Sequence, residues 1–126
     1  MRRIVLSAIQ LAAWFAVTGL IVLTVVPPVM RPESSFPSAL EHVAAFFVAG
    51  VLNYLGYPRR VMASLAIAIA FAGGIELLQI PLPGRHARFT DFVIDGLAAC
   101  AGNLVGFLLV RMGLVQLSKK RAHPLR

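Results

Sequence analysis

Hydrophobic residues along this chain occur in four long runs that are separated by short polar segments. The runs cover about residues 4–26, 40–57, 61–80 and 92–110, and a basic tail over 111–126 follows the last of them. A helix needs roughly 20 apolar residues to cross a hydrocarbon core, so each run is a candidate membrane span. We therefore predict an all-α integral membrane protein, a four-transmembrane-helix bundle that forms one membrane domain over residues 1–126.

The first run differs from a cleaved signal peptide. It contains no charged residue from Ile4 to Val26, and it ends at Pro27 and Pro28 rather than at a small-x-small cleavage site. The apolar core of a signal peptide is also shorter than this run. We expect the segment to remain in the membrane as the first helix.

Composition supports the membrane interpretation. The chain is 59% hydrophobic and only 13% charged, whereas soluble domains carry roughly 25% charged residues. This excludes a soluble globular domain and an intrinsically disordered chain. Twelve Lys and Arg against five Asp and Glu give a net charge of +7. The basic residues are divided between both termini and a short loop, so we expect the lipid bilayer, and no nucleic acid, as the partner of this charge.

Basic residues are unequally divided between the two sides of the predicted membrane. Nine lie on the side of the termini, and three lie on the other side, namely Arg31, Arg85 and Arg88. Basic loops stay preferentially in the cytoplasm. We therefore predict a multi-pass protein of the bacterial inner (cytoplasmic) membrane with both termini cytoplasmic.

All acidic residues fall on the side opposite the termini. They are Glu33, Glu41, Glu76, Asp91 and Asp95. Acidic residues contribute little to membrane orientation, so their grouping is an observation independent of the assigned topology. It predicts one polar face at the outer ends of the helices.

Helical spacing brings several of these polar side chains onto shared faces. Glu76 and Gln79 are three residues apart, and Asp91 and Asp95 are four apart. Asn103 continues the second face, where Gly102 and Gly106 form a Gly-x-x-x-Gly pattern that permits close helix contact. The predicted pocket residues are His42, Glu76, Gln79, Arg85, Arg88, Asp91 and Asp95, with Glu41 and Asn103 in a second line.

Several functions fit such a pocket. The arginines could neutralise the carboxylates and fix the loop, or they could hold the phosphate of a lipid-linked or other envelope intermediate. Paired carboxylates with a histidine could perform acid–base chemistry on a lipid-linked substrate. No nucleophile motif and no metal-ligand spacing occur, so a non-enzyme is favoured and no metal or cofactor is expected. A non-catalytic accessory subunit of a membrane complex is a further alternative, and the oligomeric state is left open.

The order of these motifs resembles the VanZ-like family of small bacterial membrane proteins, between about Ser38 and Gly106. The resemblance consists of Ile75-Glu76 with Gln79, Pro83-Gly84-Arg85, the pair Asp91 and Asp95, and Gly102. His42 with Phe46, Phe47 and Gly50 is similar to the family's H-F-x-x-[FY]-F pattern.

Two departures accompany the resemblance. The family often has Asp-Lys where this chain has Ser38 and Ala39, and it often has glycine where this chain has Ala98. Any role that needs the acid–lysine pair is therefore not expected here. The family's namesake is associated with low-level resistance to the glycopeptide teicoplanin. Taken with the arginines beside the pocket, this leads us to expect a cell-envelope protein that binds or shields an anionic component, such as an envelope lipid or cell-wall precursor, and that affects glycopeptide susceptibility.

Overall fold

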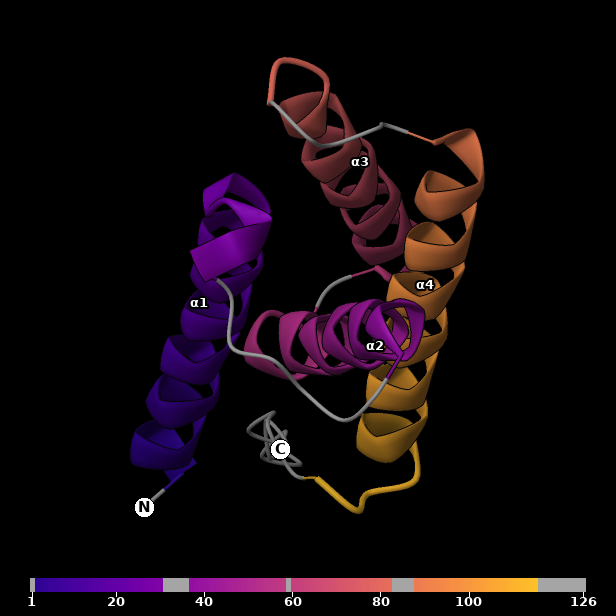
Figure 1. Ribbon diagram of the computed structural model, residues 1–126. Coiled ribbons are helices and arrows are strands. Elements are labelled where there is room, and N and C mark those ends of the chain that lie inside the picture. The colour runs from indigo at the N-terminus through magenta and orange to yellow at the C-terminus, as the bar shows by residue number, and fades with distance from the viewer. Residues whose placement is uncertain (1, 31–36, 59, 83–87, 116–126) are drawn as a thin grey trace, which may run out of the picture.

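The computed structural model describes residues 2–30, 37–58, 60–82 and 88–115, and this part of the chain is helical without any strand (Figure 1). The elements are α1 (Arg2–Val25), the 3₁₀ turn η1 (Pro28–Met30), α2 (Ser38–Gly56), α3 (Val61–Gln79) and α4 (Phe89–Arg111). All four α-helices are long and apolar enough to cross a membrane. The predicted all-α, four-helix membrane fold is confirmed.

The largest difference from the predicted spans is at the start of α4, which begins at Phe89 instead of residue 92. The carbonyl oxygen of Arg88 accepts hydrogen bonds from the backbone N–H groups of Asp91 and Phe92. The first turn of α4 therefore forms before the hydrophobic run begins. Asp91 lies in that first turn, where a negative charge is favourable beside the unpaired N–H groups of a helix. The helix therefore begins three residues before the hydrophobic run that predicted it.

Consecutive helices run in opposite directions. The Gln10 amide of α1 donates a hydrogen bond to the Gly56 carbonyl at the end of α2 (3.0 Å), and Glu76 near the end of α3 contacts Arg88 at the start of α4. The contacts of His42 with Asp95 and of Tyr54 with Phe107 show that α2 and α4 run in the same direction. The end of the bundle that holds the last turns of α1 and α3 and the first turns of α2 and α4 is named the polar end below. In Figure 1 the last turns of α3 and the first turns of α4 lie at the top, and α2 crosses the middle of the view.

The closest helix packing is between α2 and α4, which face each other through small residues (Figure 1). A Cβ atom on Gly102 would collide with the carbonyl oxygen of Phe47, and one on Gly50 would collide with the carbonyl oxygen of Ala99. At Gly106 an added Cβ would lie 2.9 Å from the Cβ of Tyr54. The two backbones are therefore in near contact, and the close approach predicted from the glycine spacing is confirmed.

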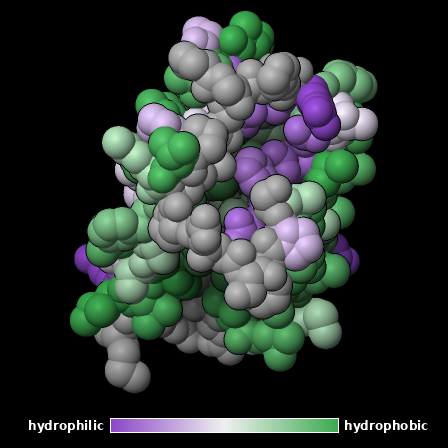
Figure 2. Space-filling view, viewed as in Figure 1, coloured by the Kyte–Doolittle hydropathy of each residue, from purple (hydrophilic) through white to green (hydrophobic). Residues whose placement is uncertain are grey.

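The core of the bundle is narrow, and large apolar residues lie mostly outside it. Leu20, Phe46, Ala72 and Ile75 belong to one buried cluster. Exposed residues such as Trp14, Phe15, Leu97 and Leu108 cover the outer surface. This distribution is expected when the surrounding solvent is hydrocarbon. Figure 2 shows the same division, with hydrophilic residues gathered in the upper part of the molecule and hydrophobic residues along its flanks.

Candidate functional site

The four acidic residues within the described ranges all lie in the last turns of α3 or the first turns of α2 and α4. They are Glu41, Glu76, Asp91 and Asp95, and Glu33 lies outside the described residues. The alternating directions of the helices bring these turns to the polar end. The basic Arg3, Arg60 and Arg111 lie at the opposite end.

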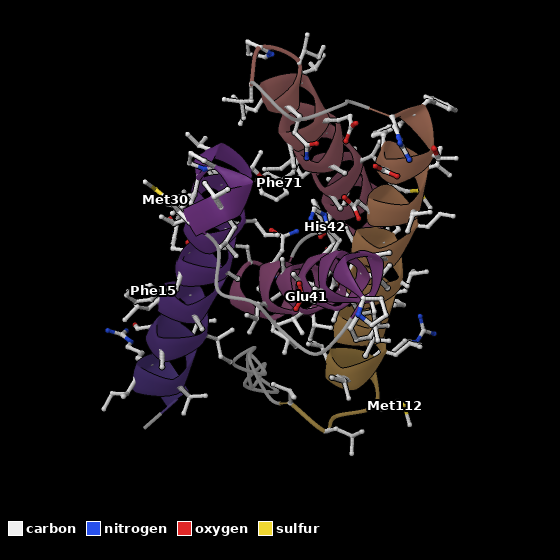
Figure 3. The ribbon with its side chains drawn as sticks, in the orientation of Figure 1. Phe15, Met30, Glu41, His42, Phe71 and Met112 are labelled. Atoms are coloured by element: carbon white, nitrogen blue, oxygen red, sulfur yellow. The ribbon has the colours of Figure 1, made fainter. Side chains whose placement is uncertain are left out.

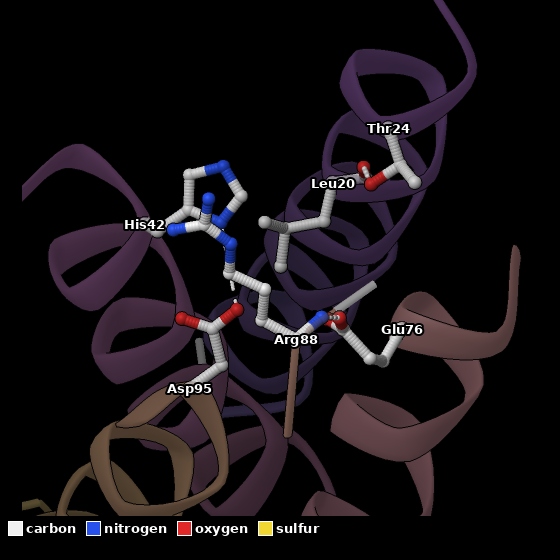
Figure 4. Close-up of polar contacts among 6 residues, drawn as sticks. All are labelled: Leu20, Thr24, His42, Glu76, Arg88 and Asp95. Carbon is white, nitrogen blue, oxygen red and sulfur yellow. Dashed lines mark hydrogen bonds and ion pairs between the residues drawn. The ribbon is translucent and has the colours of Figure 1, made fainter. Parts of the chain in front are cut away.

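A polar contact between His42 and Asp95 joins α2 and α4 at this end. The His42 Nδ1 atom lies 3.4 Å from a carboxylate oxygen of Asp95 (Figure 4). The Asp95 side chain is buried, and His42 is partly exposed, so the imidazole lies between the carboxylate and the outside. Phe46, one turn further along α2, stacks on the His42 ring with 6.4 Å between ring centroids. The histidine is therefore oriented by an acid and an aromatic ring.

Among the residues that the structure describes, the hydrogen-bond donor to Glu76 is a backbone N–H and not a basic side chain. Its carboxylate accepts a hydrogen bond from the backbone N–H of Arg88, the residue that precedes α4 (Figure 4). This contact ties the last turns of α3 to the start of α4. The carboxyl group of Glu76 also lies within electrostatic reach of Asp91, Asp95 and His42. The structure thus brings these four predicted residues together.

The guanidinium group of Arg88 has a different role from its backbone. The residue is exposed, and its guanidinium forms no ion pair or hydrogen bond within the described part of the chain. In Figure 4 its side chain points toward His42 and Asp95. Neutralisation of Glu76 or Asp95 by the Arg88 side chain is therefore not what holds this site together. Arg85, the second predicted arginine, lies outside the described residues.

Two uncharged polar residues complete the polar end. Gln79 is 7% exposed, and its side-chain amide makes no hydrogen bond to any residue that the structure describes. Thr24 of α1 is 3% exposed and donates its hydroxyl proton to the Leu20 carbonyl at 2.7 Å (Figure 4). Sequence reasoning assigned no site residue to the first helix, because a threonine bonded to its own helix is compatible with an apolar run.

The two second-line residues do not join this cluster. Glu41 is exposed, and Figure 3 shows it on a different face of α2 from His42. Asn103 lies two turns below Asp95 and is fully buried. Its Oδ1 accepts hydrogen bonds from Asn53 (3.1 Å) and from Ser64, so it belongs to a separate polar cluster. Sequence reasoning missed Asn53 and Ser64, whose only signal was their position inside apolar runs.

The site offers hydrogen-bonding and charged groups but no compact ligand set. Within the described ranges, no three His, Cys, Asp or Glu side chains are grouped so that they could hold a metal ion. The polar groups gathered at this end include the exposed Arg88, the partly exposed His42 with the buried Asp95, and the buried Gln79. Such a set can bind an anion or move a proton.

Fold and site together define a small four-helix membrane protein with acidic and polar residues concentrated at one end. A family model described as VanZ/LLP1 matches residues 4–112, and the chain belongs to this family. The match extends beyond the segment Ser38–Gly106 and includes α1. Neither the curated proteins nor the solved structures contain a match to this chain.

Proposed function

We propose that this VanZ/LLP1 family member is a cell-envelope protein that binds or shields an anionic envelope component at its polar end. It resides in the bacterial cytoplasmic membrane with both termini in the cytoplasm, so that the polar end faces outward. The unequal division of basic residues, nine against three, supports this orientation. Family membership and the four membrane-spanning helices support the envelope setting.

The observation that carries the proposal is that the Arg88 guanidinium forms no ion pair or hydrogen bond with any residue that the structure describes. The carboxylates close to it have other contacts, because Asp95 meets His42 and Glu76 accepts the Arg88 backbone N–H. The guanidinium is therefore available to a phosphate or carboxylate, which it can contact through two parallel hydrogen bonds. Arg85 is three residues away in the sequence and is proposed as a second cationic contact.

Replacing Arg88 by alanine removes this cation cleanly, because the backbone N–H that holds Glu76 remains. We expect a deletion strain complemented with Arg88→Ala to show the susceptibility of the deletion strain across a panel of envelope-targeting antibiotics that includes teicoplanin. Arg88→Lys should restore part of the phenotype, since it keeps the charge without the planar fork. Arg85→Ala should behave like Arg88→Ala.

The matched control is Arg60→Ala, which removes an exposed arginine at the opposite end. It should complement fully. The amount of each protein in isolated membranes is measured alongside susceptibility. If the Arg88→Ala protein fails to accumulate in the membrane, Arg88 contributes to the stability of the protein. If deletion of the gene leaves antibiotic susceptibility unchanged, the protein has no function in resistance.

A second candidate is acid–base catalysis on a lipid-linked envelope substrate, and the His42–Asp95 contact favours it. An imidazole oriented by a buried carboxylate is a common proton-transfer arrangement. Asp95→Asn and Glu76→Gln preserve side-chain size and remove the proton-accepting groups. Under catalysis at least one of them should lose function by 100-fold or more, of the order that general acid–base groups contribute (about 10²–10⁴). Full complementation by both variants would eliminate catalysis and leave binding in place.

A further inference from the structure

The bundle contains a cavity that the proposed function does not use. Its volume is about 350 Å³, and all four helices contribute to its wall. Most lining residues are apolar, among them Ala13, Val17, Ala49, Ile67 and Ala68. Small-molecule pockets span roughly 300–1,000 Å³ and are mostly apolar with a few polar groups. The cavity therefore has the size and lining of a binding site.

Phe46 separates this cavity from the polar end. It is fully buried, lines the cavity, and stacks on His42 one turn above it. Phe71 packs against the Phe46 ring, with 6.0 Å between the two ring centroids, and also lines the cavity. A molecule in the cavity would thus lie below the His42–Asp95 pair and touch neither residue.

One wall of the cavity is polar. Asn53, Tyr57 and Asn103 line it. The Asn53 amide nitrogen donates both of its hydrogens, to Ser64 Oγ at 3.2 Å and to Asn103 Oδ1 at 3.1 Å. Its Oδ1 atom accepts no hydrogen bond from any residue that the structure describes. The Asn53 side chain can therefore form a further hydrogen bond only as an acceptor, through Oδ1. A bound molecule with a hydrogen-bond donor is favoured at this position.

We propose that this cavity binds one hydrocarbon chain of a membrane amphiphile that carries a hydroxyl group, with the hydroxyl donating to Asn53 Oδ1. The helices around the cavity are long and apolar enough to lie in the bilayer, where hydrocarbon chains are the surrounding molecules. The apolar wall suits the chain. An amphiphile that offers only ester or ether oxygens cannot donate to Asn53 Oδ1 and therefore lacks this hydrogen bond.

Trp14 provides a direct readout. It is the only tryptophan of the chain, and it lines the cavity beside Tyr57, whose hydroxyl accepts the indole N–H at 2.7 Å. The full-length protein in nanodiscs of non-brominated phospholipid is titrated with 11-bromoundecan-1-ol, whose bromine quenches tryptophan fluorescence on contact. We expect quenching that saturates at low mole fraction of the alcohol. The corresponding methyl ether should bind about three- to tenfold more weakly, the effect of one hydrogen bond.

Two filling variants and their controls separate the cavity from bulk lipid. Ala68→Leu on α3 and Ala49→Leu on α2 place a larger side chain in the cavity wall and should abolish saturable quenching. Ala70→Leu and Ala44→Leu make the same change at exposed positions of the same helices and should preserve it. Having two filling variants keeps the test decisive if one of them fails to fold.

The outcomes are distinct. Quenching that rises in proportion to the bromide in every protein would show that Trp14 senses only surrounding lipid, which overturns the proposal. Equal binding of alcohol and ether would overturn the assignment of a hydroxyl donor. Loss of saturation in the filling variants alone, together with weaker binding of the ether, is the expected result.

Discussion

At the scale of single residues, Asn103 shows how this protein tolerates polar groups inside a membrane. Its side chain is fully buried, and its amide nitrogen donates to the Ala99 carbonyl at 2.9 Å. Its Oδ1 accepts from Asn53 and from Ser64, so three helices meet at one amide. In hydrocarbon no water can replace these partners, and an unpaired polar group there is costly.

Asn103→Leu should therefore destabilise the bundle. The substitution leaves the Asn53 amide and the Ser64 hydroxyl without their acceptor, and we expect the free energy of unfolding to fall by about 1–3 kcal/mol. Denaturant titration in mixed micelles, followed by circular dichroism, measures this change. Ser64→Ala serves as the comparison and should cost less, because it removes the Ser64 hydroxyl but leaves the hydrogen bond from Asn53 to Asn103 in place.

The double variant Asn103→Leu/Ser64→Ala tests the contact itself. If the two residues interact, the loss in the double variant should be smaller than the sum of the single losses. Strict additivity would contradict a direct hydrogen bond between them.

At the scale of elements, the α2–α4 interface determines the geometry of the site. His42 reaches Asp95 because glycines at the crossing let the two backbones approach. Gly50 and Gly102 each leave room for a carbonyl oxygen of the other helix. Small residues are the usual means of close packing between membrane helices, where apolar burial supplies no driving force.

Gly102→Ala should separate these helices. The new methyl group would meet the backbone of Phe47 and Val51, which cannot move independently of α2. We expect a loss of about 1–3 kcal/mol in the free energy of unfolding, typical of overpacking. The same micelle titration measures it.

Gly74→Ala is the matched control on α3, because nothing lies within 4 Å of its added Cβ. It should leave stability unchanged or raise it by up to about 1 kcal/mol, since alanine favours a helix over glycine. A similar loss of unfolding free energy in both variants would show that replacing a helical glycine is itself destabilising. The loss in Gly102→Ala would then not be specific to the α2–α4 interface.

At the scale of the whole molecule, charge is separated along the bundle axis. The acidic residues of the described ranges lie at the polar end, whereas Arg3, Arg60 and Arg111 lie at the other. Because consecutive helices alternate in direction, acidic residues from different parts of the chain meet at one end of the bundle and these arginines meet at the other. This arrangement underlies the proposed orientation.

Cysteine labelling tests that orientation. Cys100 is the only cysteine and is replaced by alanine, and single cysteines are then placed at the exposed positions Met30 and Leu114, at opposite ends. In intact spheroplasts a membrane-impermeant maleimide should label Met30→Cys and not Leu114→Cys. Detergent treatment should make Leu114→Cys reactive. The reverse pattern in intact spheroplasts would place the termini outside.

The sequence by itself determined the four spans, the common side of the acidic residues and the close contact of the glycine-spaced fourth helix. These properties depend on local hydrophobicity and helical period, which neighbouring helices do not alter. Only the tertiary structure decided the partners: Asp95 with His42, Glu76 with a backbone N–H, and Asn103 with Asn53 and Ser64. It also created the cavity below Phe46. Partner choice depends on how each helix is rotated and at what depth it packs, because side chains far apart in the sequence meet only when the backbones are placed.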